Sequence, residues 1–234
     1  MRKCDQSVRS IWHKRFLMAG SILIGTLAVI GFAVAANGTD GQGTATGNEE
    51  AGKLLFSDDF STSKSGWTTY SKGSLLAAYK NGSYILTAVP ANYWSYNSNP
   101  RLNLTDFIVE VEATKVSGPD DNVFGLAFRR RPGYNYAFLI SSDGYYDFRE
   151  INNNTYVDSQ NWTESESIKT GSQPNLIKLV AQGDKFSFYA NGEKLGDHVD
   201  DTLVNGSIGL YVGSQSEGNV TIAFDNFKVW SLKE

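Results

Sequence analysis

Cysteine and histidine are almost absent from this chain of 234 residues. The single cysteine, Cys4, excludes an intrachain disulfide, because there is no second sulfur to pair with it. Of the two histidines, His13 precedes a long apolar run and His198 lies far beyond it. The chain after that run therefore holds one histidine and no cysteine, and no Ser-His-Asp or Cys-His catalytic set can be assembled from it.

Basic residues are scarce after the first 36 positions. Those positions hold five basic residues and one acidic residue, a net charge of +4, whereas the whole chain carries −4. The remaining residues therefore carry a net charge of −8. A domain with that charge repels phosphate backbones at long range, which excludes nucleic acid as an expected partner.

Residues 16–36, FLMAGSILIGTLAVIGFAVAA, contain no charged residue at all. This run is long enough for one helix to span a bilayer, and the basic flank before it predicts that the N-terminus lies in the cytoplasm. A cleaved signal peptide is the alternative, because Ala33-Val34-Ala35 fits a small-x-small cleavage site. The run exceeds a usual signal-peptide core, which favours an uncleaved anchor. We therefore expect a single-pass protein of the cell membrane with an extracytoplasmic domain, or a secreted domain if the segment is removed.

The charge and composition pattern divides the chain into four parts. The expected parts are a basic cytoplasmic segment, a transmembrane signal anchor, a flexible Gly- and Thr-rich linker and a β-sandwich domain, at residues 1–15, 16–36, 37–53 and 54–234. Within the anchor, Ser21 and Gly25 form a small-xxx-small pair. Such a pair would let a helix of a membrane-protein partner approach closely.

From residue 54 onward, short strands alternate with turns. Residues 107–114, FIVEVEAT, alternate between apolar and polar side chains, which is typical of a half-buried strand. Asn81-Gly82 and Asn191-Gly192 each separate two apolar runs and predict tight hairpins. About a dozen such strands, without helical periodicity, predict an all-β fold, namely a two-sheet antiparallel jelly-roll sandwich.

Several segments of this domain have a familiar pattern: LFSDDFS near its start, GLAFR and NYAFLISSDGYYDF in the middle, NLIKLVAQGDKFSFYANGEKL and GSIGLYV later, and FDNFKVW at its end. Together they resemble concanavalin A-like lectin/glucanase sandwiches, and among these the LamG-like and 3-keto-disaccharide-hydrolase-like extracytoplasmic domains. The resemblance implies two curved antiparallel sheets, first and last strands side by side, and a sugar site on the concave face.

Glucanases of that fold carry their catalytic carboxylates on one strand, as Glu-x-Asp-x-x-Glu or Glu-x-Asp-x-Glu. This chain has neither pattern. Glu110 and Glu112 have the spacing that places two carboxylates on one face of a strand, but the central aspartate and the third carboxylate are missing. We therefore expect a non-catalytic binding module, with a glycoside hydrolase of an unfamiliar type as an alternative.

Aromatic and polar residues that suit a sugar ligand occur in two loops and in three neighbouring strands. Sugars stack their C–H groups on tryptophan and tyrosine, and their hydroxyls bond to polar side chains such as that of Arg149. The candidate ligand-binding residues are Tyr93, Trp94, Tyr96, Arg129, Tyr136, Tyr146 and Trp162. Strand alternation predicts that Arg129 shares a face with Ala127. Tyrosine is also a favoured strand residue, and an accessory subunit of a membrane-protein complex is the alternative to carbohydrate binding.

The resemblance also implies a structural calcium where the first and last strands meet, held by backbone oxygens and a late aspartate. Asp225 occupies the place of that aspartate, and Asp59 lies near the start of the domain next to Asp58. Calcium prefers about six to eight oxygen ligands. The alternative is that Asp225 only accepts hydrogen bonds from backbone amides at a bulge. No cofactor is otherwise expected.

Overall fold

The computed structural model describes residues 50–153, 155–159 and 162–233. The predicted transmembrane anchor at 16–36, with Ser21 and Gly25, lies outside these residues. Among the described residues, no helix is long and apolar enough to cross a membrane.

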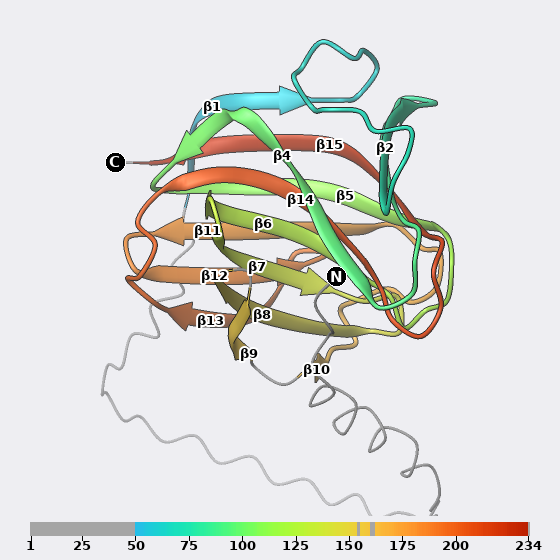
Figure 1. Cartoon of the computed structure of the whole chain (residues 1–234). Coiled ribbons are helices and arrows are strands. Elements are labelled where there is room, and N and C mark those ends of the chain that lie inside the picture. Colours follow the sequence, from blue (N-terminus) through green and yellow to red (C-terminus); the bar gives the residue numbers. More distant parts are fainter. Residues whose placement is uncertain (1–49, 154, 160–161, 234) are drawn as a thin grey trace, which may run out of the picture. The chain divides into compact units, whose positions relative to one another are not determined.

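The described domain consists of strands that pair antiparallel in two sheets (Figure 1). The larger sheet has eight strands in the order β13-β12-β11-β5-β15-β3-β2, and β1 also pairs with β15. Its strands are β1 (Ala51–Asp58), β2 (Leu75–Lys80), β3 (Ser83–Ala88), β5 (Phe107–Ser117), β11 (Asn175–Gln182), β12 (Lys185–Ala190), β13 (Glu193–Val199) and β15 (Val220–Leu232).

The smaller sheet has seven strands in the order β10-β8-β7-β6-β14-β4, and β9 pairs with β8. Its strands are β4 (Tyr93–Leu104), β6 (Val123–Arg131), β7 (Tyr134–Ile140), β8 (Tyr145–Asn152), β9 (Thr155–Ser159), β10 (Thr163–Glu164) and β14 (Gly206–Ser214). The predicted all-β architecture with two antiparallel sheets is thereby confirmed.

Apolar and aromatic side chains fill the space between the two sheets. In β5, Val109, Val111 and Ala113 are fully buried, whereas the alternating glutamates are not, which confirms the predicted half-buried strand. Across the sandwich, Phe138 of β7 stacks on Phe188 of β12 with ring centroids 4.8 Å apart. Burial of apolar area and ring pairs of this kind hold the two sheets together.

Both predicted Asn-Gly hairpins are confirmed by their backbone angles. Asn81 and Gly82 have φ angles of 53° and 76°, and Asn191 and Gly192 have φ angles of 54° and 89°. Positive φ at both central residues is the mark of a type I′ turn, which Asn-Gly adopts easily. These turns set the register of β2 against β3 and of β12 against β13.

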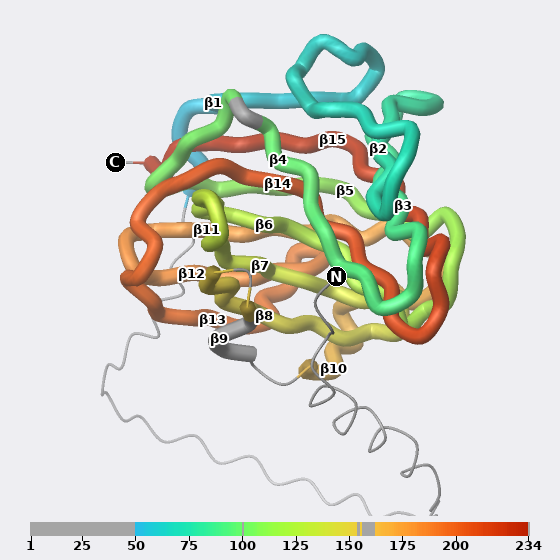
Figure 2. Tube along the Cα trace, in the orientation of Figure 1, coloured from blue at the N-terminus to red at the C-terminus, as the bar shows by residue number. Residues whose placement is uncertain are grey.

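The first and last strands of the domain lie side by side, as the resemblance implied. β1 pairs with the second half of β15, from Phe227 to Leu232, whereas β3 pairs with the first half, from Val220 to Phe224 (Figure 2). Between these halves β15 shifts register against β5, and Asn226 there has a φ of 50°. One edge of β15 therefore changes its neighbour from β3 to β1 at this bulge.

Candidate functional site

Three of the predicted ligand-binding residues lie together on the outer face of the seven-stranded sheet, the face turned away from the other sheet. Trp94 and Tyr96 are two positions apart on β4 and so point to the same side. Trp162 precedes β10, at the opposite edge of the sheet. The rings of Trp94 and Trp162 nevertheless meet edge to face, with centroids 6.5 Å apart. Two distant segments thus form one aromatic surface.

An ion pair lies against these two tryptophans. Arg149 Nε donates to Asp147 Oδ2 at 2.6 Å, and both residues stand on β8. The Arg149 guanidinium carbon is 4.7 Å from the ring centroid of Trp94 and 5.8 Å from that of Trp162, within cation–π range. The Asp147 side chain is fully buried, and that of Arg149 is 12% exposed. We call Trp94, Trp162, Arg149 and Asp147 the tryptophan cluster.

The tryptophan cluster shows that the seven-stranded sheet curves toward its outer face. Trp94 is on β4 and Arg149 is on β8, four strand spacings away in the sheet order. Four spacings amount to about 19 Å in a flat sheet, which is more than these two side chains can bridge at their 4.7 Å contact. Curvature of the sheet therefore brings side chains from near its two opposite edges, on β4 and β8, into contact above the strands between them. The tryptophan cluster thus lies on a concave surface.

A glycine on β14, the strand next to β4, makes room for the indole of Trp94. A Cβ atom on Gly213, which pairs with Trp94, would lie 2.8 Å from its Cδ1 atom. The indole therefore lies directly against the backbone of β14. Its Nε1 donates to the carbonyl oxygen of Ser214 at 3.1 Å, which fixes the orientation of the ring.

Tyr96 and Tyr211 continue the outer face along β4 and β14. Their ring centroids are 5.8 Å apart, and both belong to the same apolar cluster as the two tryptophans. Arg130 Nε donates to the Tyr96 hydroxyl at 3.2 Å, and its guanidinium lies 5.6 Å from the centre of that ring. The outer face therefore carries a second pairing of arginine with aromatic rings.

Three predicted tyrosines point to the interior of the sandwich instead. Tyr93 packs against the core between the sheets. Tyr136 is fully buried, its hydroxyl accepts a hydrogen bond from Leu203 N at 2.9 Å, and burial raises its pKa. The Tyr146 hydroxyl donates to the carbonyl oxygen of Leu195 at 2.7 Å. The structure therefore does not bring these three residues to the tryptophan cluster.

The prediction that Arg129 shares a face with Ala127 is wrong. The pairing of β6 with both neighbours shifts register after Phe128, and Arg129 has a φ of 47°. This bulge turns the side chain from the outer face into the interior, where it is 1% exposed. Its guanidinium carbon lies 4.8 Å from the ring centroid of Phe186, and desolvation lowers its pKa. Arg129 is thus a buried structural residue.

The predicted calcium ligands, Asp59 and Asp225, lie near the junction of β1 and β15. Asp59 Oδ1 accepts hydrogen bonds from Ser61 Oγ and N at 2.7 and 3.0 Å, and these lower its pKa. Asp225 Oδ1 accepts from Asn226 N at 2.7 Å, while burial and the neighbouring charge of Glu112 raise its pKa. Within the described ranges, no three Asp, Glu, His or Cys residues group so as to hold a metal ion. The calcium stays a prediction.

The sequence analysis missed Asp147 as a member of the tryptophan cluster. The available signal was its spacing of two from Arg149, which places both side chains on one face of β8. No local signal shows that this face meets Trp94 and Trp162, because that contact depends on the curvature of the whole sheet.

No protein-family model and no curated protein matches this chain, but solved structures do. The carbohydrate-binding module CBM66 from Bacillus subtilis aligns with a TM-score of 0.54 and 20% identity, over 71% of this chain and 96% of that one. A Bacillus subtilis protein of unknown function with a galectin-like fold aligns with a TM-score of 0.59 and 15% identity, over 79% and 99%. A prokaryotic β-1,3-1,4-glucanase (lichenase) from a mouse hindgut metagenome aligns with a TM-score of 0.55 and 12% identity, over 76% and 99%. The described domain therefore has the jelly-roll sandwich fold of concanavalin A-like lectins and glucanases.

Proposed function

We propose that this domain is a non-catalytic module that binds carbohydrate at the tryptophan cluster. The observation that carries the proposal is the meeting of Trp94 and Trp162, 6.5 Å apart, over the ion pair of Arg149 and Asp147 on a concave sheet. Tryptophans from two distant segments that converge on a curved surface provide apolar area for the C–H faces of a sugar. The charged pair beneath them supports the two rings through the cation–π contacts of Arg149.

Two further points support this proposal. One structural neighbour is a carbohydrate-binding module, and another has a galectin-like fold. In addition, the sequence lacks the carboxylate pattern of the glucanases that share this fold. The missing carboxylate pattern favours binding without hydrolysis.

We propose further that the domain works outside the cell, held at the membrane by residues 16–36 through the linker at 37–53. The uncharged run and its basic flank support this location. Alkaline carbonate extraction of membranes from the native host checks it, since an anchored chain stays in the pellet. Release of the chain into the supernatant would show that the segment does not anchor it.

The binding proposal is tested with the full-length chain on a glycan array, followed by affinity measurements on the best ligand. Trp94→Ala and Trp162→Ala are each expected to weaken binding by about tenfold or more, because buried aromatic anchors dominate binding energies. Tyr70→Ala is the matched control, because Tyr70 is an exposed aromatic residue, 43% accessible, outside the cluster. Equal loss in all three variants, or no loss in either tryptophan variant, would refute the assignment of the site.

A second variant tests the geometry without removing an aromatic ring. Gly213→Ala places a methyl group within 2.8 Å of Trp94 Cδ1, so the indole has to move. We expect weaker sugar binding, together with a change in the near-UV circular dichroism of the tryptophans. The same substitution in a Trp94→Ala background should have no further effect on binding. Hydrolysis of any bound glycan would contradict the non-catalytic part of the proposal.

A further inference from the structure

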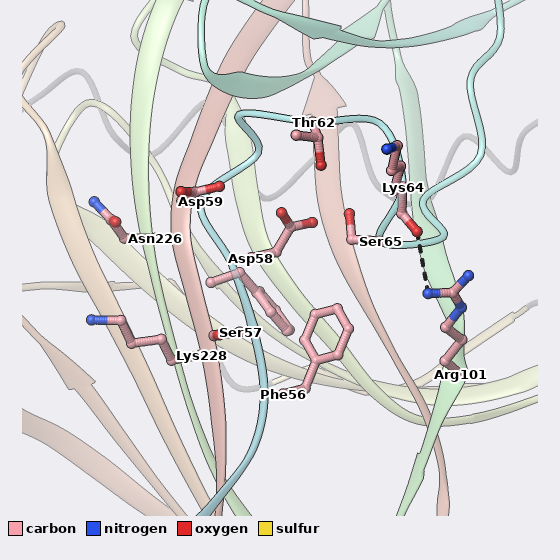
Figure 3. A pocket seen from close by; sticks show the side chains of 11 residues that line it. Phe56, Ser57, Asp58, Asp59, Thr62, Lys64, Ser65, Arg101, Asn226 and Lys228 are labelled. Carbon is pink, nitrogen blue, oxygen red and sulfur yellow. Dashed lines mark hydrogen bonds between the residues drawn. The ribbon is translucent and has the colours of Figure 1, made fainter.

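A pocket lies where β15 changes its neighbour from β3 to β1. Its volume is about 540 Å³, and it lies between the end of β1, the loop that follows and Arg101 of β4 (Figure 3). We call it the junction pocket. It differs from the tryptophan cluster in all of its residues, and its volume falls in the range of about 300–1,000 Å³ that is typical of small-ligand sites.

Asp58, the last residue of β1, is a buried carboxylate that lines the junction pocket. It is 8% exposed. Its Oδ1 atom accepts a hydrogen bond from Phe60 N at 2.8 Å, whereas no described residue donates to its Oδ2 atom. A buried charged oxygen without a donor is costly to the folded state, so a ligand that donates to it is favoured.

Basic side chains line the same pocket. Arg101 lies beside the Asp58 carboxylate and Lys64 belongs to the loop above it, whereas the Lys228 side chain points away from Asp58 (Figure 3). Arg101 Nη1 donates to the carbonyl oxygen of Lys64 at 3.2 Å, which leaves most of its N–H groups for other partners. Among the ion pairs of the described residues, none involves these three cations. Lys64 and Arg101 are therefore available to pair with an anion in the pocket.

One wall of the junction pocket is apolar. Phe56 of β1 is half-buried there and packs edge to face on the buried Phe227, with ring centroids 6.0 Å apart. The open part of a half-buried ring offers a surface for C–H groups of a ligand. The pocket thus combines one buried acceptor, two cations and an aromatic wall.

We propose that the junction pocket binds a small hydroxyl-bearing carboxylate, such as one uronic acid unit of an acidic polysaccharide. A hydroxyl of the sugar donates to Asp58 Oδ2. Its carboxylate pairs with Arg101, whose planar guanidinium suits a carboxylate, and with Lys64. Its C–H face lies against Phe56.

Calcium is the competing occupant, and the lack of grouped ligands argues against it. Calcium needs about six to eight oxygen ligands. In the part of the chain that the structure describes, no three Asp, Glu, His or Cys residues group so as to hold a metal ion. Binding of calcium without a sugar is therefore measured as a separate part of the test.

The proposal is tested by calorimetry of the full-length chain with glucuronate, with glucose and with calcium chloride. Glucuronate is expected to bind at least about tenfold more tightly than glucose, because a charged hydrogen-bonded pair is lost in the neutral sugar. Equal binding of the two sugars, binding of calcium alone, or no binding of any probe would each overturn the proposal.

Two variants assign the binding to this pocket. Asp58→Asn keeps the acceptor for Phe60 N but removes the charge, so glucuronate affinity should fall by about tenfold to a hundredfold. The same variant should raise the melting temperature without ligand by about 2–4 °C, because the buried unpaired charge is gone. Arg101→Gln should also weaken glucuronate binding, because the sugar carboxylate loses its guanidinium partner. Unchanged affinity in both variants would overturn the proposal.

Tyr70→Ala is the control for these variants, because Tyr70 is exposed and lies outside both sites, and it should leave glucuronate binding unchanged. Trp94→Ala separates the two sites. Loss of glucuronate binding in Trp94→Ala, with binding retained in Asp58→Asn, would place the acidic sugar at the outer face and refute the junction pocket as its site.

Discussion

Replacing Arg129 by methionine is expected to lower the free energy of unfolding by about 3–5 kcal/mol. The Arg129 guanidinium is buried and donates to the carbonyl oxygens of Leu203, Thr105 and Gly183 at 2.7, 3.0 and 2.6 Å. Methionine fills a similar space but donates nothing, so three carbonyl groups, among them that of the buried Leu203, lose the donor that Arg129 provides. The loss should appear in urea unfolding followed by tryptophan fluorescence.

The three carbonyl groups belong to different connections of the sandwich. Thr105 lies between β4 and β5, Gly183 between β11 and β12, and Leu203 between β13 and β14. Arg129 on β6 therefore joins the turns at one end of both sheets through a single side chain. Its loss should loosen all three connections together, which hydrogen exchange of the flanking amides would show.

The neighbouring Arg131 provides the matched control. It is exposed, and its guanidinium donates to the Asn205 side chain at 2.6 Å and to the Asn205 backbone oxygen at 3.1 Å. Arg131→Met should therefore change the free energy of unfolding by less than about 1 kcal/mol. Similar losses in both variants would mean that the buried hydrogen bonds of Arg129 contribute little.

The three consecutive arginines at positions 129–131 show what sequence patterns can and cannot predict. Alternation along β6 is correct up to Phe128, and the alternating pattern of β5 and both Asn-Gly turns follow from local residue types. The bulge at Arg129 has no such signal, because a non-glycine residue with positive φ is held in place by the surrounding structure. One inserted position then reversed the predicted face of the side chain.

The candidate sites depend on contacts that only the assembled sandwich creates. Side chains alternate between the two faces of a strand, so Tyr93 and Trp94 lie on opposite faces of β4, whereas Asp147 and Arg149 lie on the same face of β8. The meeting of Trp94 with Trp162 follows instead from strand order and curvature. The junction pocket depends on where β1 and β3 end along β15, which pairing over long sequence distances determines.

Gly125 lies on the central strand β6, and Gly125→Ala is expected to cost about 4 kcal/mol or more. A Cβ atom there would lie 2.2 Å from the carbonyl oxygen of Phe138 on the neighbouring strand, and the residue has a φ of 153°. Backbone atoms cannot yield as a flexible side chain does, so β6 and β7 would have to separate. Urea unfolding, or the yield of folded protein if the variant does not fold, measures this cost.

Gly196→Ala is the matched control for this substitution. Gly196 also lies within a strand, β13, but its backbone is not in the positive-φ region and a Cβ atom would meet nothing closer than 3.7 Å. The free energy of unfolding of Gly196→Ala should differ from that of the original chain by no more than about 0.5 kcal/mol.

Gly125 pairs with Tyr211 on one side and with Leu139 on the other, and both of these residues lie on the outer face. A stable Gly125→Ala variant would therefore show that the curved sheet beneath the tryptophan cluster can shift to admit a methyl group.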